Sequence, residues 1–433
     1  MPGRSWIHSM TARVLFGLLA GAVIGTGLAA WAPDAAARAA YFAEPLGRLW
    51  LNALQMTVVP LVVTLVVVGV TTASDAAASG RIARQALVVF IILLAAGACF
   101  VAIAAPALLS WLPKDPGLAA SLRDATGTPV TSSTTPQLAE WFSGIVPSNA
   151  IAAAAQSAML PLVVFALFFG FGLTRIRPEQ RARVVELFQA IADTMIVIVR
   201  WILWVAPIGV FALVLVVCAR VGGSMLTALG YYILLQCSMY LTITLALYLV
   251  AMFFGGEPIR RFAAAILPAQ AIAASTQSSL ASLPAMLESA QSRLGYTRAV
   301  TALVLPMAVS LFRITSPMQY LGAATFIAWA YGIDLSFAQL SVGVTLAVVL
   351  SLGAVGLPGQ VSFMASTLPV TQSMGLPIEP LGILLAIDTV PDVFATVGNV
   401  TADLTATSIV ARQVNAGPQR EAVAAEQSET SSS

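Results

Sequence analysis

The stretch that decides the fold is Leu-Ala-Ile-Asp-Thr-Val-Pro-Asp-Val-Phe-Ala-Thr-Val-Gly-Asn-Val-Thr-Ala-Asp-Leu, residues 385–404. It reads as an apolar helix that carries polar groups at regular intervals. At about 100° per residue, five of these groups fall within an arc of roughly 80°. They are Asp388, Asp392, Thr396, Asn399 and Asp403. The spacing therefore predicts a helix with one polar, carboxylate-rich face.

The composition around this helix is that of a membrane protein. Of 433 residues, 59% are hydrophobic and 9% are charged, with a mean hydropathy of +0.90, whereas soluble domains carry about 25% charged residues. The net charge of +2 gives no basic field for nucleic acid. One histidine, His8, and three cysteines without metal or disulfide spacing argue against enzymes built on such groups. We expect an all-α integral membrane protein without a cofactor.

In that setting the polar face requires a functional explanation. A carboxylate at the centre of a membrane helix costs about 2.5–3.5 kcal/mol, so it persists where it faces a protein interior and meets a cation. A helix end whose charge merely reaches the membrane surface would explain Asp403 alone. Asp388 and Asp392 have further apolar helix on both sides, which favours a binding site.

Eight apolar stretches are long enough to cross a bilayer, which takes about 20 residues. They are 12–31, 49–72, 86–112, 150–173, 193–218, 229–254, 299–331 and 378–411. Arginines gather on one side of an alternating topology, which predicts cytoplasmic N- and C-termini in a bacterial-type inner membrane. We expect no removable signal peptide, an exposed loop at 126–137 and a disordered tail over 414–433.

Two further apolar segments are interrupted near their middle by small or hydroxyl residues ending in Leu-Pro. They are Ala-Ser-Thr-Gln-Ser-Ser-Leu-Ala-Ser-Leu-Pro-Ala (274–285) and Ser-Leu-Gly-Ala-Val-Gly-Leu-Pro-Gly-Gln (351–360). Backbone freed from a helix at membrane depth must be satisfied internally or line a wet cavity. Paired interruptions of this kind indicate a transporter site. Two ordinary apolar loops are the alternative; the repeated pattern favours re-entrant hairpins at about 260–290 and 340–375.

The span before the second hairpin carries a buried cation. Arg313 is the only charged residue between Leu303 and Ala330, and a guanidinium does not lose its proton in a protein. We hypothesise that it pairs with a carboxylate of the polar face, preferably Asp403. Pro317 and Pro391 each remove a backbone donor, which predicts local unwinding at these points.

These motifs resemble those of the dicarboxylate/amino acid:cation symporter family, the glutamate transporter homologues, over nearly the whole chain. The resemblance rests on Thr-Gln-Ser-Ser-Leu-Ala-Ser-Leu-Pro (276–284), Gly-Leu-Pro-Gly (356–359) and Asp-Xaa₃-Asp…Asn-Val-Thr-Ala-Asp (388–403). It implies eight transmembrane helices plus two re-entrant helical hairpins in the glutamate-transporter (elevator) fold, assembled as a homotrimer in the lipid bilayer. It also implies a scaffold of 1–72 and 133–228 and a mobile transport domain of 73–113 and 229–413.

By position in the family motifs, Asp392 would hold the ammonium group of an amino acid substrate, and Asn399 its carboxylate. The other substrate-binding positions implied are Ser278, Ser279, Ser316, Gly356, Pro358, Gly359 and Thr396. Ala395 stands where members with acidic substrates have an arginine that clamps a second carboxylate. We therefore expect an amino acid with a neutral side chain; Arg313 keeps a C4-dicarboxylate or an acidic amino acid open as the alternative.

The cation sites depart from the family pattern. Phe312-Arg313-Ile314-Thr315-Ser316 replaces the family's Asn-Met-Asp-Gly-Thr signature. The oxygens of Asp403, Asn399 and Ser310 are too few for a sodium site, because hard cations need several oxygen ligands. We expect the fixed charge of Arg313 to replace sodium near Asp403, so that transport is sodium-independent.

Coupling would then be to a proton on Asp388 or Asp392, or absent. A channel or a non-transporting sensor on the same fold is the remaining alternative. An enzyme is the least expected class, because Ser278 and Ser279 have no histidine or lysine base nearby in the motif.

Overall fold

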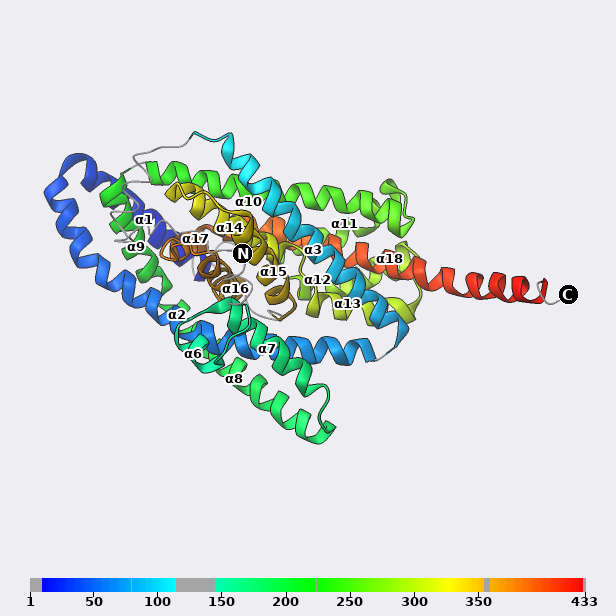
Figure 1. Cartoon of the computed structure of the whole chain (residues 1–433). Coiled ribbons are helices and arrows are strands. Elements are labelled where there is room, and N and C mark those ends of the chain that lie inside the picture. Colours follow the sequence, from blue (N-terminus) through cyan, green and yellow to red (C-terminus); the bar gives the residue numbers. More distant parts are fainter. Residues whose placement is uncertain (1–9, 79, 114–144, 223, 354–358, 431–433) are drawn as a thin grey trace. The chain divides into compact units, whose positions relative to one another are not determined.

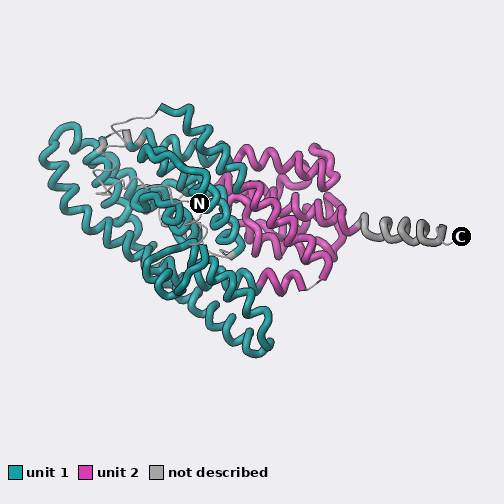
Figure 2. Tube along the Cα trace, viewed as in Figure 1, with its two compact units in different colours: residues 1–71, 98–239, 316–392 teal, residues 72–97, 240–315, 393–433 magenta. Residues whose placement is uncertain are grey.

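The computed structural model describes residues 10–78, 80–113, 145–222, 224–353 and 359–430, and all regular structure in these ranges is helical (Figure 1). The chain divides into two compact units (Figure 2). Unit 1 comprises Met1–Thr71, Ala98–Met239 and Ser316–Asp392; unit 2 comprises Thr72–Gly97, Tyr240–Thr315 and Val393–Ser433. The units follow contact density, whereas the predicted scaffold and transport domain concern movement and stay a prediction.

Most helices belong to one unit; four cross from one unit to the other over several residues, and a fifth has only its first residue, Thr315, in unit 2. Unit 1 holds α1 (Met10–Trp31), most of α2 (Pro33–Ala78), the end of α3 (Arg81–Ser110), α6 (Ala150–Ala155), α7 (Met159–Leu173), α8 (Pro178–Trp204), α9 (Ala206–Val221), the start of α10 (Ser224–Val250), α14 (Thr315–Tyr331), α15 (Phe337–Gly353), α16 (Gly359–Ser373) and α17 (Leu381–Ile387). Unit 2 holds α11 (Ile259–Thr276), α12 (Ser279–Glu288), α13 (Arg298–Leu311), the π-helical turns η1 (Ala251–Gly255) and η2 (Ser289–Arg293), and most of α18 (Thr389–Thr430).

Several helices of the described ranges can cross a membrane. Five are long and apolar enough: Pro33–Ala78, Arg81–Ser110, Thr227–Gly255, Arg298–Tyr331 and Thr389–Val414. The pair α8–α9, bent by 59°, makes a sixth if it forms one span, and three shorter apolar helices are Phe16–Trp31, Met159–Leu173 and Phe337–Leu352. The chain is a multi-pass membrane protein; the count of eight spans plus two hairpins stays a prediction.

Helix α1 packs along α9 through glycines at four-residue spacing. A Cβ atom at Gly21 would lie 2.7 Å from the carbonyl oxygen of Phe211, and one at Gly25 would lie 2.8 Å from the Cβ atom of Cys218. Small residues let membrane helices approach this closely. Beside this pair, the buried indole of Trp50 donates a hydrogen bond of 3.1 Å to the carbonyl oxygen of Ile202, near the α8–α9 bend.

The two predicted proline breaks are confirmed. Helix α13 ends at Leu311 and α14 begins at Thr315, because Pro317 has no N–H for the carbonyl of Arg313. Helix α17 ends at Ile387 and α18 begins at Thr389, where Pro391 lacks the same bond. The predicted spans 299–331 and 378–411 are therefore each divided, and the polar residues of both lie beside the breaks.

Both predicted hairpins contain a pair of packed helices. In unit 2, α11 packs on α12, with Gln277 between them in the left-handed region (φ 52°). In unit 1, α15 packs on α16, and their connection at 354–358 lies outside the described residues. That these pairs re-enter a membrane stays a prediction.

Two sequence predictions differ from the structure. The single span 193–218 is divided at Val205, where Pro207 in the first turn of α9 accompanies the 59° bend. The segment 414–433, expected to be disordered, continues α18 as a helix to Thr430. Alanine and glutamate dominate 421–426, and both are strong helix formers, so low hydropathy alone was a poor guide. The loop 126–137 lies outside the described residues.

Candidate functional site

The predicted site residues are divided between the two units. Unit 1 contains Ser316, Asp388 and Asp392, and unit 2 contains Ser278, Ser279, Ser310, Arg313, Thr396, Asn399 and Asp403. Gly356 and Pro358 lie outside the described residues, and Gly359 is the first residue of α16. The geometry within each unit shows which of the predicted groups are engaged and by what.

The polar face of the last helix is buried in protein. Asp403 is 0% exposed, and Thr396 and Asn399 are 1% exposed each. Asp388 is 7% exposed, and Asp392 is half-buried. Burial of polar groups on one helical face is what the 385–404 pattern predicted.

Asn399 is fixed by a residue that the sequence reasoning did not assign to the site. Thr315 approaches it within unit 2: the backbone N–H and the hydroxyl of Thr315 donate to the Asn399 Oδ1 atom, at 3.1 and 2.9 Å. The Nδ2 atom of Asn399 is buried and has no hydrogen-bond acceptor among the described residues. The amide is thus oriented by its oxygen, and its two N–H groups are left to donate to a ligand.

Asp403 and Arg313 lie close enough in unit 2 to interact electrostatically. They form no ion pair within 4.0 Å among the described residues, and neither oxygen of Asp403 accepts a hydrogen bond there. The Nε atom of Arg313 is also buried without an acceptor in the described part of the chain. The charge of Arg313 therefore acts on Asp403, as expected of a partner, but the two side chains do not make the direct contact that an ion pair requires.

Asp388 lies in a different environment, within unit 1. The side-chain amide of Gln319 donates to its Oδ2 atom at 2.6 Å. Gln236 of α10 in turn donates to the backbone carbonyl of Gln319 at 3.2 Å and to the Tyr232 hydroxyl at 3.4 Å. These three polar residues of apolar helices α10 and α14 hold Asp388 in a buried network, which the sequence reasoning missed.

The first hairpin tip presents hydroxyl groups that are partly engaged. The Ser278 Oγ atom accepts the N–H of Ala281 at 3.2 Å and so caps α12. Its hydroxyl hydrogen stays available for donation, because a hydroxyl is donor and acceptor together. Deeper in the hairpin, Gln270 of α11 donates to the hydroxyls of Thr401 at 2.8 Å and Tyr248 at 2.9 Å, a further link to α18 that the sequence reasoning did not name.

The remaining predicted residues differ in burial. Ser316 is 7% exposed and Ala395 is 5% exposed, while Ser310 is exposed. Within the described ranges no group of three or more His, Cys, Asp or Glu side chains is arranged to hold a metal ion. Each unit therefore contributes its own group of polar side chains: Asp388 and Ser316 are buried in unit 1, and Thr396, Asn399 and Asp403 are buried in unit 2.

The family model of the sodium:dicarboxylate symporters matches residues 10–413. The chain belongs to this family. Like other members of the sodium:dicarboxylate symporter family it is a membrane transporter and not an enzyme, as the motifs at 276–284, 356–359 and 388–403 predicted.

Relatives within the family carry different names. The proton/glutamate-aspartate symporter of Escherichia coli K12 is 29% identical over 427 residues, 96% of each chain. The neutral amino acid transporter B(0) of Bos taurus is 30% identical over 404 residues, covering 85% of this chain and 72% of the relative. The C4-dicarboxylate transport protein of Bacillus subtilis is 26% identical, with 94% of each chain covered. These similarities place the chain among symporters of small organic ions.

Proposed function

We propose that this protein transports an amino acid with a neutral side chain by a sodium-independent, elevator-type mechanism. In the proposal Asp392 binds the substrate ammonium group and the Nδ2 atom of Asn399 donates to its carboxylate. The geometry that supports the second role is the Thr315–Asn399 contact, which leaves the amide donors of a fully buried asparagine unused. Ser278, Ser279, Ser316, Thr396 and the second hairpin tip (Gly356, Pro358 and Gly359) are proposed to complete the binding site.

The observation that carries the substrate class is the side chain at position 395. Ala395 lies on the polar face of α18, because it comes four residues before Asn399, and residues four apart lie on the same side of a helix. It is buried and has no charge. A second carboxylate on the substrate would require a bidentate cation there, so a substrate with one carboxylate fits better.

Arg313 supports the sodium-independent part of the proposal. Its guanidinium acts on the buried Asp403 from within unit 2, and Ser310, one of the few other oxygen donors, is exposed. A fixed cation cannot dissociate, so it supplies charge balance without coupling transport to sodium. The coupling ion would be a proton carried by Asp388 or Asp392, or none.

Transport assays in liposomes test both parts. Purified protein should take up serine or alanine equally in sodium and choline buffers, with little uptake of succinate, fumarate or aspartate. Steep sodium dependence would reject the coupling proposal, and preference for succinate would reject the substrate proposal. Introducing an arginine by Ala395→Arg should move the substrate preference toward aspartate. Ala302→Arg, at an exposed position of α13, is the control; Ala406 is unsuitable for this purpose because it is buried.

A C4-dicarboxylate or acidic amino acid carrier is the second candidate function, favoured by Arg313 and by two of the relatives. Thermal stabilisation of the detergent-purified protein separates it from the first, since aspartate, glutamate or succinate would then stabilise the protein and serine would not. Saturable counterflow of substrate in liposomes would exclude the remaining alternative, a channel or a sensor.

A further inference from the structure

Unit 1 contains a cavity of about 390 Å³ whose lining includes none of the predicted transport-site residues. Helix α2 lines it with one helical face: Glu44, Arg48, Leu51, Asn52 and Gln55 follow the spacing that places residues side by side on a helix. Helix α9 and the segment 378–383, at the start of α17, supply apolar walls. The volume lies within the range of about 300–1,000 Å³ that is usual for small-molecule sites.

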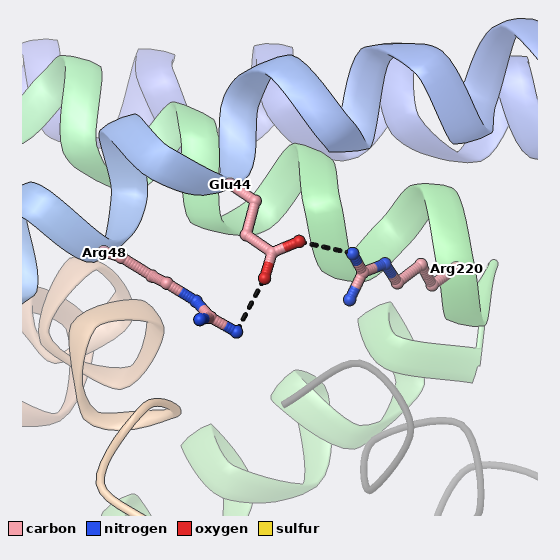
Figure 3. Close-up of polar contacts among 3 residues, drawn as sticks. All are labelled: Glu44, Arg48 and Arg220. Atoms are coloured by element: carbon pink, nitrogen blue, oxygen red, sulfur yellow. Dashed lines mark hydrogen bonds and ion pairs between the residues drawn. The ribbon is translucent and has the colours of Figure 1, made fainter. Parts of the chain in front are cut away.

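The positive charges beside this cavity already have partners. Figure 3 shows Glu44 between two arginines: its Oε1 atom is 2.6 Å from Arg48, and its Oε2 atom is 2.5 Å from Arg220. The Glu44 side chain is 24% exposed, so this ion cluster is partly shielded from water. Both guanidinium groups contact the same carboxylate, so neither arginine lacks a direct partner, and the cluster of two arginines and one glutamate carries a net charge of +1.

The second carboxylate of the lining, Glu379, has no direct cationic partner among the described residues. Glu379 forms no ion pair with any described residue, and its Oε2 atom is buried without a hydrogen-bond donor in the described ranges. Apolar side chains adjoin it in the cavity wall, among them Ile378, Pro380 and Ile383. A partly desolvated carboxylate gains most from a cation that replaces its lost water.

We propose that this cavity is a binding site for a compact organic cation. Its ammonium group would contact Glu379, and its apolar body would lie against Leu213, Val216 and Ile383, while the side-chain amides of Asn52 and Gln55 remain available for a polar substituent. An anion is disfavoured because the nearby arginines are already paired with Glu44. A neutral amphiphile would fill the cavity without using Glu379. The residues that line this site do not include those proposed to bind the transported substrate.

Binding of tritiated phenethylamine to the purified full-length protein in detergent tests the proposal. We expect saturable binding that unlabelled phenethylamine displaces. The alcohol 2-phenylethanol, which has the same shape without the charge, should displace it at least tenfold more weakly than unlabelled phenethylamine does. Glu379→Gln should weaken binding at least tenfold. The control Glu186→Gln removes an exposed carboxylate of α8 and should leave binding unchanged.

A second variant keeps the test decisive if Glu379→Gln does not fold. Val216→Phe fills the cavity from α9 without changing charge and should also lower binding at least tenfold. The proposal is overturned if no saturable amine binding is found, if the alcohol competes as well as the amine, or if either the folded Glu379→Gln protein or the folded Val216→Phe protein binds the amine like the wild type. Equal competition by the alcohol would indicate a neutral amphiphile as occupant.

Discussion

Asp388 and Asp403 belong to the same polar pattern of residues 385–404, yet their surroundings differ. Within unit 1, Asp388 receives a short hydrogen bond from the neutral amide of Gln319. Within unit 2, Asp403 is completely buried, accepts no hydrogen bond from the described residues and is influenced by the charge of Arg313. A neutral donor positions a carboxylate, whereas a remote cation only balances its charge.

The comparison shows why polar residues in a membrane helix cannot be treated as one group. Asp388 is held by a direct hydrogen bond from the side chain of Gln319, and the backbone carbonyl of Gln319 in turn accepts a hydrogen bond from Gln236. Asp403 is influenced by a cation with which it forms no ion pair within 4.0 Å among the described residues.

Arg313→Met should cause the largest loss of stability. Removing the cation leaves a buried carboxylate without compensation, which costs about 3 kcal/mol. Thermal unfolding of the purified protein measures this loss, and the double variant Arg313→Met, Asp403→Asn should recover most of it. If Arg313 replaces sodium, sodium should stabilise the Arg313→Met protein and leave the wild type unchanged. An equal response of both proteins to sodium would contradict the charge-replacement hypothesis.

Asp392→Asn should abolish most transport while preserving the fold. Loss of the carboxylate that binds the ammonium group removes about 2.7 kcal/mol, or about 100-fold in affinity. Uptake of serine in liposomes and the unfolding temperature measure the two effects separately. Asp334→Asn changes an exposed aspartate after α14 and serves as the matched control. Normal uptake by Asp392→Asn would remove this residue from the site.

The fold could be predicted from the sequence to the extent that it depends on local patterns. Apolar length identified the helices, prolines 317 and 391 identified the breaks, and the Leu-Pro interruptions identified two helix pairs. Two local predictions were wrong for local reasons as well: the span 193–218 bends, and the tail 414–433 is helical to Thr430. Where a helix bends or ends depends on both helix propensity and hydropathy, so neither quantity alone predicts the helix boundaries.

The candidate site was predictable only in part. The 3.6-residue period of 385–404 identified its buried face, but the residues that contact that face come from distant positions. Gln319 lies 69 residues before Asp388, and Thr315 lies 84 residues before Asn399. Spacing carries no information about such contacts. The one usable signal was a polar amide inside an apolar helix, as at Gln236 and Gln319, since such groups are rarely left without a partner.

Gln319→Leu tests the neutral half of the comparison. It removes the amide donor of Asp388, and because hydrogen bonds to charged groups contribute about 1.5–3 kcal/mol, we expect a loss of about 2 kcal/mol in the free energy of unfolding. Gln189→Leu breaks a solvent-exposed bond to Asp193 on α8 and should change stability by less than about 0.5 kcal/mol. Equal effects of the two variants would show that the Asp388 bond contributes little.

Thr315→Val should have the smallest effect, and it distinguishes orientation of Asn399 from stability. The variant keeps the size of the side chain and the backbone N–H bond to Asn399 Oδ1, but it removes the hydroxyl donor at 2.9 Å. We expect about 1 kcal/mol of lost stability, with a larger proportional loss in substrate affinity, because the asparagine amide can then rotate. Thr315→Ser, which keeps the hydroxyl, should restore affinity in binding assays. If Thr315→Ser and Thr315→Val bind substrate equally, the orientation of Asn399 does not depend on this hydroxyl, and the backbone N–H is sufficient.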